Sequence, residues 1–306
     1  MTRSRRSLTP GTFGDADGRV REHALRRRGT LRSTDEEEEQ AMNLRGYLKL
    51  AQAPFQTMLA YRAATLFHCL GVLLRVYLMR FFWTAVYGGG GAVEGIALPM
   101  MITYATLSNV QGLVTSSDIP WWVQHKIRDG SIMIDLIRPY GFLRFLVASS
   151  AGQSLLWHGP MALLVLAASL LFVHLQPPAS PAAGLGYTAS LILAIGVNFC
   201  LSTIIGLTAF WTLELTAFNW MFDFLSLFLS GGLVPLWFLP LWARRVAEWL
   251  PFQSLAHLPL SIYIGKIEGA TVWTALLKQA AWILVLSALA WLLWKAAERK
   301  VIVQGG

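Results

Sequence analysis

The side chains able to do chemistry in this chain are few, and most lie inside long apolar runs. Tyr61, His68 and Arg75 recur every seven residues, which places them on nearly one face of a helix. An Arg at the centre of a bilayer costs about 2.5–3.5 kcal/mol, so Arg75 needs an ion pair or a wet cavity. Asp223, in a later apolar run, is a candidate partner, and Arg80 either joins this set or snorkels to the membrane surface. The chemistry expected is charge recognition along a path through a membrane.

Enzymatic signatures are missing from the sequence. The histidines beyond residue 60 show no metal-ligand spacing, and no pattern of a Ser-His-Asp triad or of paired carboxylates is present. The run GGGGAVEG at 88–95 lacks the Lys-Ser/Thr of a phosphate-binding loop and is typical of a flexible turn. We therefore expect no enzymatic activity, no metal site and no cofactor in this chain.

The elements that position these residues are membrane spans. The chain has 306 residues, 55% hydrophobic and 14% charged, whereas a soluble domain carries about a quarter charged residues. The net charge of +8 does not indicate nucleic-acid binding, because no soluble basic domain is present to carry it. Cys69 and Cys200 lie in apolar runs and are expected to be buried free thiols.

The pattern predicts an all-α polytopic membrane protein with two parts. Residues 1–43 are expected to be a disordered, charged cytoplasmic tail, unless translation starts at Met42. Residues 44–306 form the membrane domain, which begins with an amphipathic interfacial helix at 44–56. Six spans follow at about 62–86, 96–114, 142–175, 187–211, 217–233 and 272–294.

The distribution of basic residues orients these spans. An even number of spans puts both termini on one side of the membrane. That side carries Arg45, Lys49, Arg62, Lys126, Arg128, Arg138, Arg144, Lys295, Arg299 and Lys300, whereas the other carries Arg244, Arg245 and Lys266. Because cytoplasmic loops are enriched in Lys and Arg, both termini are predicted to be cytoplasmic.

A charged loop at 117–140 separates the second and third spans. Asp118 and Pro120 are typical of a helix start, Gly130 of a helix end, and Pro139 ends a second short helix. Aromatic and charged side chains cover this predicted helix–glycine–helix unit: Trp121, Trp122, Lys126, Arg128, Asp129, Asp135 and Arg138. The unit is either a knob that another protein grips or an interfacial loop anchored by its tryptophans.

The segment at 235–269 is rich in Pro and Trp and only partly apolar, which predicts short external helices, with a re-entrant hairpin as one arrangement. Small residues and prolines weaken the helix that leads into it: Ser230, Gly231, Gly232, Pro235 and Pro240. They indicate either a hinge or close packing of small side chains.

The order of these features resembles the permeases of bacterial type-2 ATP-binding-cassette (ABC) exporters. The likeness covers about 42–306 and rests on LAYRA at 59–63, IRDGSIMIDLIRP at 127–139, LFLSGGLVPLWFLPLWARRVAEWLPF at 227–252, YIGK at 263–266 and VQGG at 303–306. It implies a multi-pass protein of the bacterial inner membrane that pairs with a second permease chain, identical or related. It also implies a separate ATPase subunit that uses ATP and Mg and docks on the loop at 117–140.

Two other classes of protein stay open at this point. An ion-driven secondary transporter often shows inverted internal repeats, and none is found here. A membrane-embedded lipid-modifying enzyme needs polar residues clustered at one depth, for which only His68, Arg75 and Asp223 qualify. The sequence does not indicate the substrate.

Overall fold

The computed structural model describes residues 62–88, 90–136, 142–212 and 215–304. The predictions for the N-terminal tail, the interfacial helix at 44–56 and Tyr61 lie outside these residues, as do those for Arg138 and Pro139. Helices make up all the longer elements of the described residues, and the one β-bridge among them joins Val93 and Ile96. The prediction of an all-α protein is confirmed.

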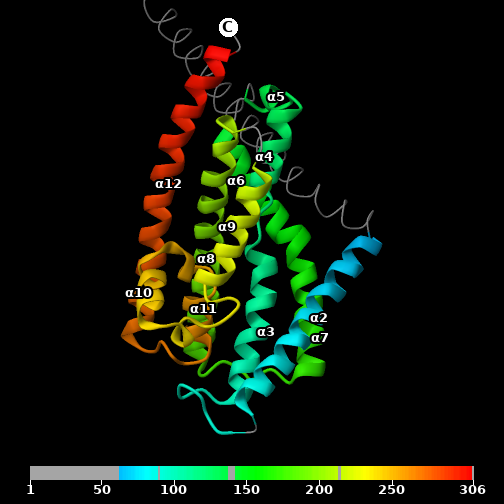
Figure 1. Cartoon of the computed structure of the whole chain (residues 1–306), viewed down its shortest axis with the longest axis vertical. Coiled ribbons are helices and arrows are strands. Elements are labelled where there is room, and N and C mark those ends of the chain that lie inside the picture. Colours follow the sequence, from blue (N-terminus) through cyan, green and yellow to red (C-terminus); the bar gives the residue numbers. More distant parts are fainter. Residues whose placement is uncertain (1–61, 89, 137–141, 213–214, 305–306) are drawn as a thin grey trace, which may run out of the picture. The chain divides into compact units, whose positions relative to one another are not determined.

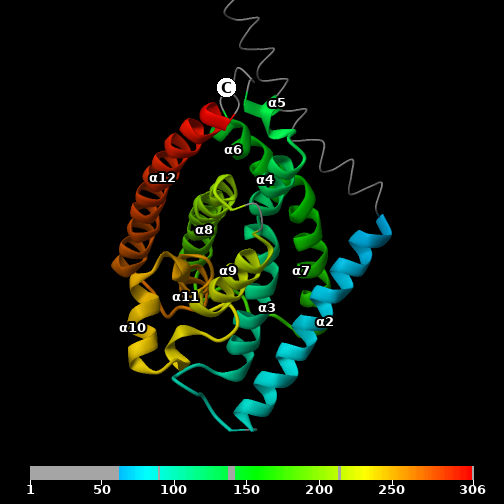
Figure 2. The ribbon, with the colours of Figure 1, turned by 45° about the horizontal axis from the view of Figure 1, so that its top comes forward.

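Four helical stretches of the described residues are long and apolar enough to cross a membrane: Ala63–Tyr87, Phe142–Val173, Pro181–Phe210 and Ala270–Lys300. They correspond to helix α2 (Arg62–Tyr87), to α6 (Phe142–Gln153) with α7 (Gly159–Val173), to α8 (Pro181–Leu207) and to α12 (Ala270–Gln304). They match the first, third, fourth and sixth predicted spans. Figures 1 and 2 show α12 as one continuous helix that extends past the predicted end of its span.

The second and fifth predicted spans are helices of a different character. Helix α3 (Leu98–Thr115) has 18 residues but does not reach the hydropathy of the other four, and α9 (Thr216–Leu229) has only 14. Helix α3 packs against α2, α7 and α8, so most of its side chains meet protein. A helix in that position tolerates polar residues, because their partners lie on the neighbouring helices.

Polar side chains of α3 donate hydrogen bonds to backbone carbonyls that lie far away in the sequence. Tyr104 donates its hydroxyl to the carbonyl of Gly231 at 2.9 Å, and Ser108 donates to the carbonyl of Gly232 at 2.8 Å. Gln111, 2% exposed, donates its amide to the carbonyl of Leu255. These bonds satisfy backbone carbonyls that the irregular segment after α9 leaves without helical partners.

A π-helix, η1 (Ser154–His158), separates α6 from α7. Pro160 lies two residues after it and has no N–H to donate to the preceding turn. The wider turn of the π-helix accommodates the missing hydrogen bond. π-Helical turns are frequent at functional sites.

Short helices form the segment between α9 and α12, as predicted: η3 (Leu236–Phe238), α10 (Leu241–Trp249), η4 (Pro251–Ser254) and α11 (His257–Tyr263). They lie beside the start of α12, whereas α4 (Ile119–Arg128) and α5 (Ile132–Leu136) lie near its end (Figures 1 and 2). The two loops singled out in the sequence therefore occupy opposite ends of the helical bundle.

Candidate functional site

The loop after α3 folds as two short helices joined at a glycine, as the sequence predicted. Helix α4 ends at Arg128, and Gly130 has φ of 70°, a left-handed conformation that favours glycine. Helix α5 begins two residues later, at Ile132. Pro120 lies in the first turn of α4, while Asp118 occupies the N-cap position without making the side-chain capping bond. The helix–glycine–helix arrangement is confirmed for residues up to 136, the cap predicted at Asp118 is not formed, and the end predicted at Pro139 lies outside the described residues.

An internal ion pair holds α4 and α5 against each other. The Nζ atom of Lys126 lies 2.9 Å from Oδ2 of Asp135, a side chain that is 1% exposed. The same Nζ lies 5.1 Å from the centre of the Trp122 ring, within cation–π range. Lys126, Asp135 and Trp122 thus make contacts within the chain, and they brace the unit instead of standing free for a partner.

The unit is seated on the ends of α8 and α12. Gly206 of α8 lets α4 approach closely: a Cβ atom there would lie 3.1 Å from Cγ2 of Ile119 and 3.4 Å from Cα of Pro120. Phe142, which packs with Ile119 in one apolar cluster, stacks on Trp294 of α12 with ring centroids 4.6 Å apart. A displacement of α4 therefore acts on two long helices at once.

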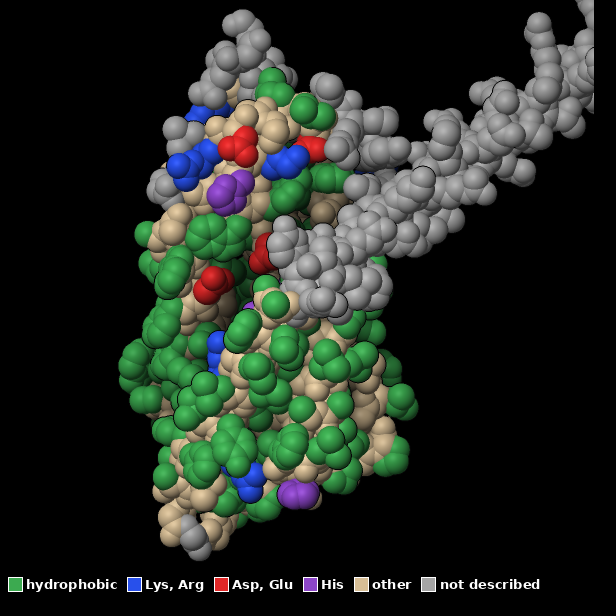
Figure 3. Space-filling view, turned by 90° about the vertical axis from the view of Figure 1, so that its right-hand side faces the viewer, with side chains coloured by type: hydrophobic (Ala, Val, Ile, Leu, Met, Phe, Trp, Pro, Cys, Tyr) green, Lys and Arg blue, Asp and Glu red, His purple; other side chains and the backbone are tan. Residues whose placement is uncertain are grey.

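The outer surface of the unit is both charged and apolar. Met133 and Ile134 of α5 are 49% and 61% exposed. Arg128 and Asp129, at the end of α4, are exposed as well, and Trp121 is half-buried. Figure 3 shows charged and apolar side chains together at this end of the molecule. The exposed surface lies on α5 and the Gly130 turn, which the sequence did not distinguish from the rest of the loop.

The described residues of the polar stripe of α2 are exposed, although His68 lies close enough to His158 of η1 to act on it electrostatically. The buried face of α2 contains Cys69, Val72 and Val76, whereas His68 and Arg75 are exposed. No ion pair joins Arg75 to Asp223 among the described residues, so the pairing considered for them is absent there. The free thiols of both cysteines are buried, as expected.

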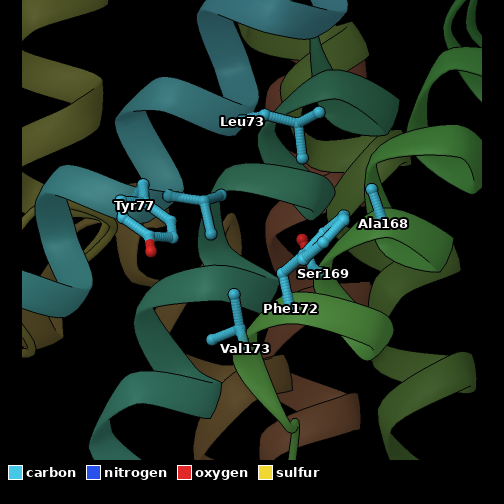
Figure 4. A pocket seen from close by; sticks show the side chains of 7 residues that line it. Leu73, Tyr77, Ala168, Ser169, Phe172 and Val173 are labelled. Atoms are coloured by element: carbon cyan, nitrogen blue, oxygen red, sulfur yellow. The ribbon is translucent and has the colours of Figure 1, made fainter.

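Arg80 lies against the end of α7. Its Nη1 donates to the carbonyl of Phe172 at 3.0 Å. Between α2 and α7 lies an apolar pocket of about 130 Å³, lined by Leu73, Val76, Tyr77, Ala168, Ser169, Phe172 and Val173 (Figure 4). The hydrogen bond gives Arg80 a packing role at one end of the α2–α7 contact.

Sequence reasoning missed the polar junction between α3 and α4. The hydroxyl of Ser116 lies 3.3 Å from both ring nitrogens of His158, the last residue of the π-helix. Asp118 is close enough to interact electrostatically with His158 and also with Asp223 of α9. The signal available in the sequence was a histidine two residues before Pro160, in the span that follows the loop. Only the tertiary contact identifies its neighbours.

The residues at 230–232 are closely packed. Gly231 has φ of 75°, and a Cβ atom there would lie 3.2–3.3 Å from His257, Leu236 and Tyr104. Ser230 accepts the backbone N–H of His257 at 2.8 Å. Of the two alternatives left open, these contacts favour close packing of small residues over a hinge. Pro235 and Pro240 precede η3 and α10 as their N-cap residues.

His257 lies under this external segment, with its ring 5.1 Å from that of Trp237. Burial lowers the pKa of His257 to about 3, and the positive charges of Arg244, Lys266 and Lys278 act in the same direction. The imidazole is therefore neutral at physiological pH. Among the described residues, no group of His, Cys, Asp and Glu side chains is arranged to hold a metal ion.

The comparisons with known proteins agree with this architecture. The family model described as "ABC-2 family transporter protein" matches residues 73–305, which is most of the chain and all of the loop at 117–140. The chain matches no curated protein. The match favours a transport subunit over an ion-driven secondary transporter or a lipid-modifying enzyme.

Proposed function

The chain belongs to the ABC-2 family of transporter proteins, and on that premise we propose that it is the permease subunit of an exporter driven by a separate ATPase. Permeases of this family work with an ABC ATPase subunit. This sequence has no phosphate-binding loop of its own, so the ATP and Mg would be bound and used by that partner. The observation that carries the proposal is the braced α4–α5 unit seated on two long helices.

Force would reach the membrane helices through the base of α4. The close approach at Gly206 couples α4 to α8, and the Phe142–Trp294 stack couples the same apolar cluster to α12. The Lys126–Asp135 ion pair keeps α4 and α5 together as they move. Movement of the ATPases would then shift α8 and α12 as rigid bodies and open a path toward the outside.

The membrane arrangement that we propose has six crossings with both termini in the cytoplasm of a bacterium. Four of the crossings would be the long helices. Helices α3 and α9 would form the other two, together with the residues on either side of each helix. The segment at 235–269 would be a re-entrant structure on the outer side. A second permease chain would pair with this one through large apolar side chains that are exposed on the surface of the single chain.

Docking of the ATPase is tested with a charge placed on the outer face of α5. Ile134→Glu, in the full chain co-expressed with a candidate ABC ATPase, is expected to reduce co-purification of the ATPase at least tenfold. Val246→Glu is the matched control, because Val246 is 52% exposed on α10 at the opposite end of the bundle. Equal co-purification of the ATPase with both variants would contradict the docking proposal.

The direction of transport is tested in membrane vesicles. Inverted vesicles, which expose the cytoplasmic face, are expected to accumulate an exported compound only when ATP is added. ATP-dependent accumulation in right-side-out vesicles loaded with ATP, and none in inverted vesicles, would instead identify an importer.

A further inference from the structure

The apolar pocket between α2 and α7 is open on one side. Its volume is about 130 Å³, and side chains of both helices line it (Figure 4). Tyr77 and Phe172, which belong to this lining, are 46% and 68% exposed. An engineered protein cavity of about 150 Å³ holds a benzene molecule. The pocket is therefore large enough for a short segment of a hydrocarbon chain, the rest of which would lie outside it.

One polar side chain lies in this apolar lining. Ser169 is 1% exposed, and its hydroxyl is bonded to no described residue. Figure 4 shows it among apolar side chains from both helices. A serine within a helix can bond to the backbone carbonyl one turn before it, and a buried hydroxyl without any partner is rare. A ligand that brings a hydrogen-bond acceptor into the pocket would satisfy this hydroxyl.

A cation lies at one end of the pocket. Arg80 follows Tyr77 by three residues, so it lies about one turn further along the same side of α2. Its Nη1 atom donates to the carbonyl of Phe172 at 3.0 Å. A guanidinium has five N–H donors, and no ion pair among the described residues includes Arg80. The remaining donors can form a two-pronged contact with a phosphate group.

The order of these groups along the helices matches that of a phospholipid. Ser169 precedes Phe172 by three residues, so it lies about 4.5 Å further from the end of α7 than the residue that Arg80 contacts. In a phospholipid, the glycerol separates the phosphate from the ester carbonyls, and the acyl chains follow them. A phosphate at Arg80 therefore places an ester carbonyl near Ser169 and the start of an acyl chain beside Leu73, which lines the pocket one turn before Tyr77.

We propose that this pocket binds one anionic phospholipid. Its phosphate contacts Arg80, an ester carbonyl accepts the hydroxyl of Ser169, and the upper part of one acyl chain lies between α2 and α7. Charge favours an anionic lipid over a zwitterionic one, because the ammonium of a zwitterionic headgroup would be repelled by the guanidinium. The bound lipid contacts both helices and stabilises their pairing. The site requires only that α2 and α7 cross a membrane, and it is independent of the proposed ATPase and cargo.

The test measures lipid binding to the full chain in detergent by native mass spectrometry. Dioleoylphosphatidylglycerol and dioleoylphosphatidylcholine carry the same acyl chains, and only the first has a net negative charge. The first molecule of phosphatidylglycerol is expected to bind at least about fivefold more tightly than the first molecule of phosphatidylcholine. An excess of inorganic phosphate is not expected to displace it, because free phosphate makes no contact with the apolar lining.

Two variants separate the headgroup from the ester. Arg80→Gln is expected to weaken binding of phosphatidylglycerol about tenfold and that of phosphatidylcholine less, since hydrogen bonds to charged groups contribute that much. Ser169→Ala is expected to weaken binding of both lipids about fivefold, the effect of one hydrogen bond. Arg245→Gln is the matched control, because Arg245 is exposed on α10 and lines no part of the pocket. It should leave both affinities unchanged, and size-exclusion chromatography verifies that each variant is folded.

Equal affinity of the unmodified chain for the two lipids overturns the proposal without any variant. Displacement of the lipid by inorganic phosphate would identify a simple anion site and overturns it as well. Unchanged lipid binding in folded Arg80→Gln has the same consequence, and if that variant also fails to pair with a second copy of the chain, the pocket belongs to an interface between copies. The assay contains no ATP, ATPase or cargo, so its result bears on the lipid site alone.

Discussion

Gly206 offers the sharpest test of how the α4–α5 unit is attached to the membrane helices. A Cβ atom at this position would lie 3.1 Å from Cγ2 of Ile119, 3.5 Å from its carbonyl oxygen and 3.4 Å from Cα of Pro120. The side chain of Ile119 can move by a few tenths of an ångström, but the backbone of α4 cannot do so without moving the helix. Leu at position 206 should therefore displace α4, whereas Ala should be tolerated.

The magnitude follows from a comparison of two glycines in helices. Replacing either with Leu gains helix propensity of about 0.8–1 kcal/mol, so that contribution cancels between them. Gly112 of α3 is the matched control, because it is exposed and a Cβ atom there meets no atom within 4 Å. Overpacking a close contact costs about 1–3 kcal/mol. Gly206→Leu should therefore be less stable than Gly112→Leu by about that amount.

The assay is thermal unfolding of the full chain in detergent, followed by size-exclusion chromatography after heating. Gly206→Leu is expected to unfold several degrees Celsius below Gly112→Leu, since about 1 kcal/mol shifts Tm by roughly 2–4 °C in chains of 150–250 residues. Gly206→Ala is expected to match the unmodified chain. Equal Tm values for the two Leu variants would refute the close seating of α4 on α8.

Two predictions concern the external segment. Gly231 and Gly269 both have a positive φ, so the backbone strain of an Ala is shared, and the three close atoms at Gly231 should make Gly231→Ala less stable than Gly269→Ala by about 1–3 kcal/mol, measured as a lower Tm. His257 has a pKa lowered from 6.5 to about 3 in the folded chain, so the unfolded chain binds its proton first. Stability is therefore complete above pH 6.5 and falls between pH 6.5 and 3, by at most about 1.4 kcal/mol per pH unit. Replacing this residue in His257→Phe should flatten the dependence of Tm on pH; an unchanged slope would assign the effect to another group.

The sequence by itself determined the membrane class, the positions of the long helices and the shape of the loop at 117–140. These features depend on local signals, which are runs of apolar residues, the helix-ending Gly130 and the absence of a phosphate-binding loop. The family resemblance rested on the same ordered motifs, and the family match confirms it. The boundaries of α3 and α9 were harder to predict. In α3 the reason is that Tyr104 and Ser108 hydrogen-bond to carbonyls of another segment, and a hydropathy pattern carries no information about such contacts.

The tertiary structure alone decided which side chains meet. Lys126 and Asp135 were predicted to offer contacts to a partner, and they pair with each other because the turn at Gly130 folds α5 back toward α4. Arg75 and Asp223 were considered as a pair, and they make no ion pair among the described residues, because Arg75 lies away from the buried face of α2. Asn219 is a polar residue within an apolar run of the sequence, and only the fold shows that its side chain is 2% exposed. Spacing along one helix fixes the side on which a residue lies, but only the packing of other helices decides what that side faces.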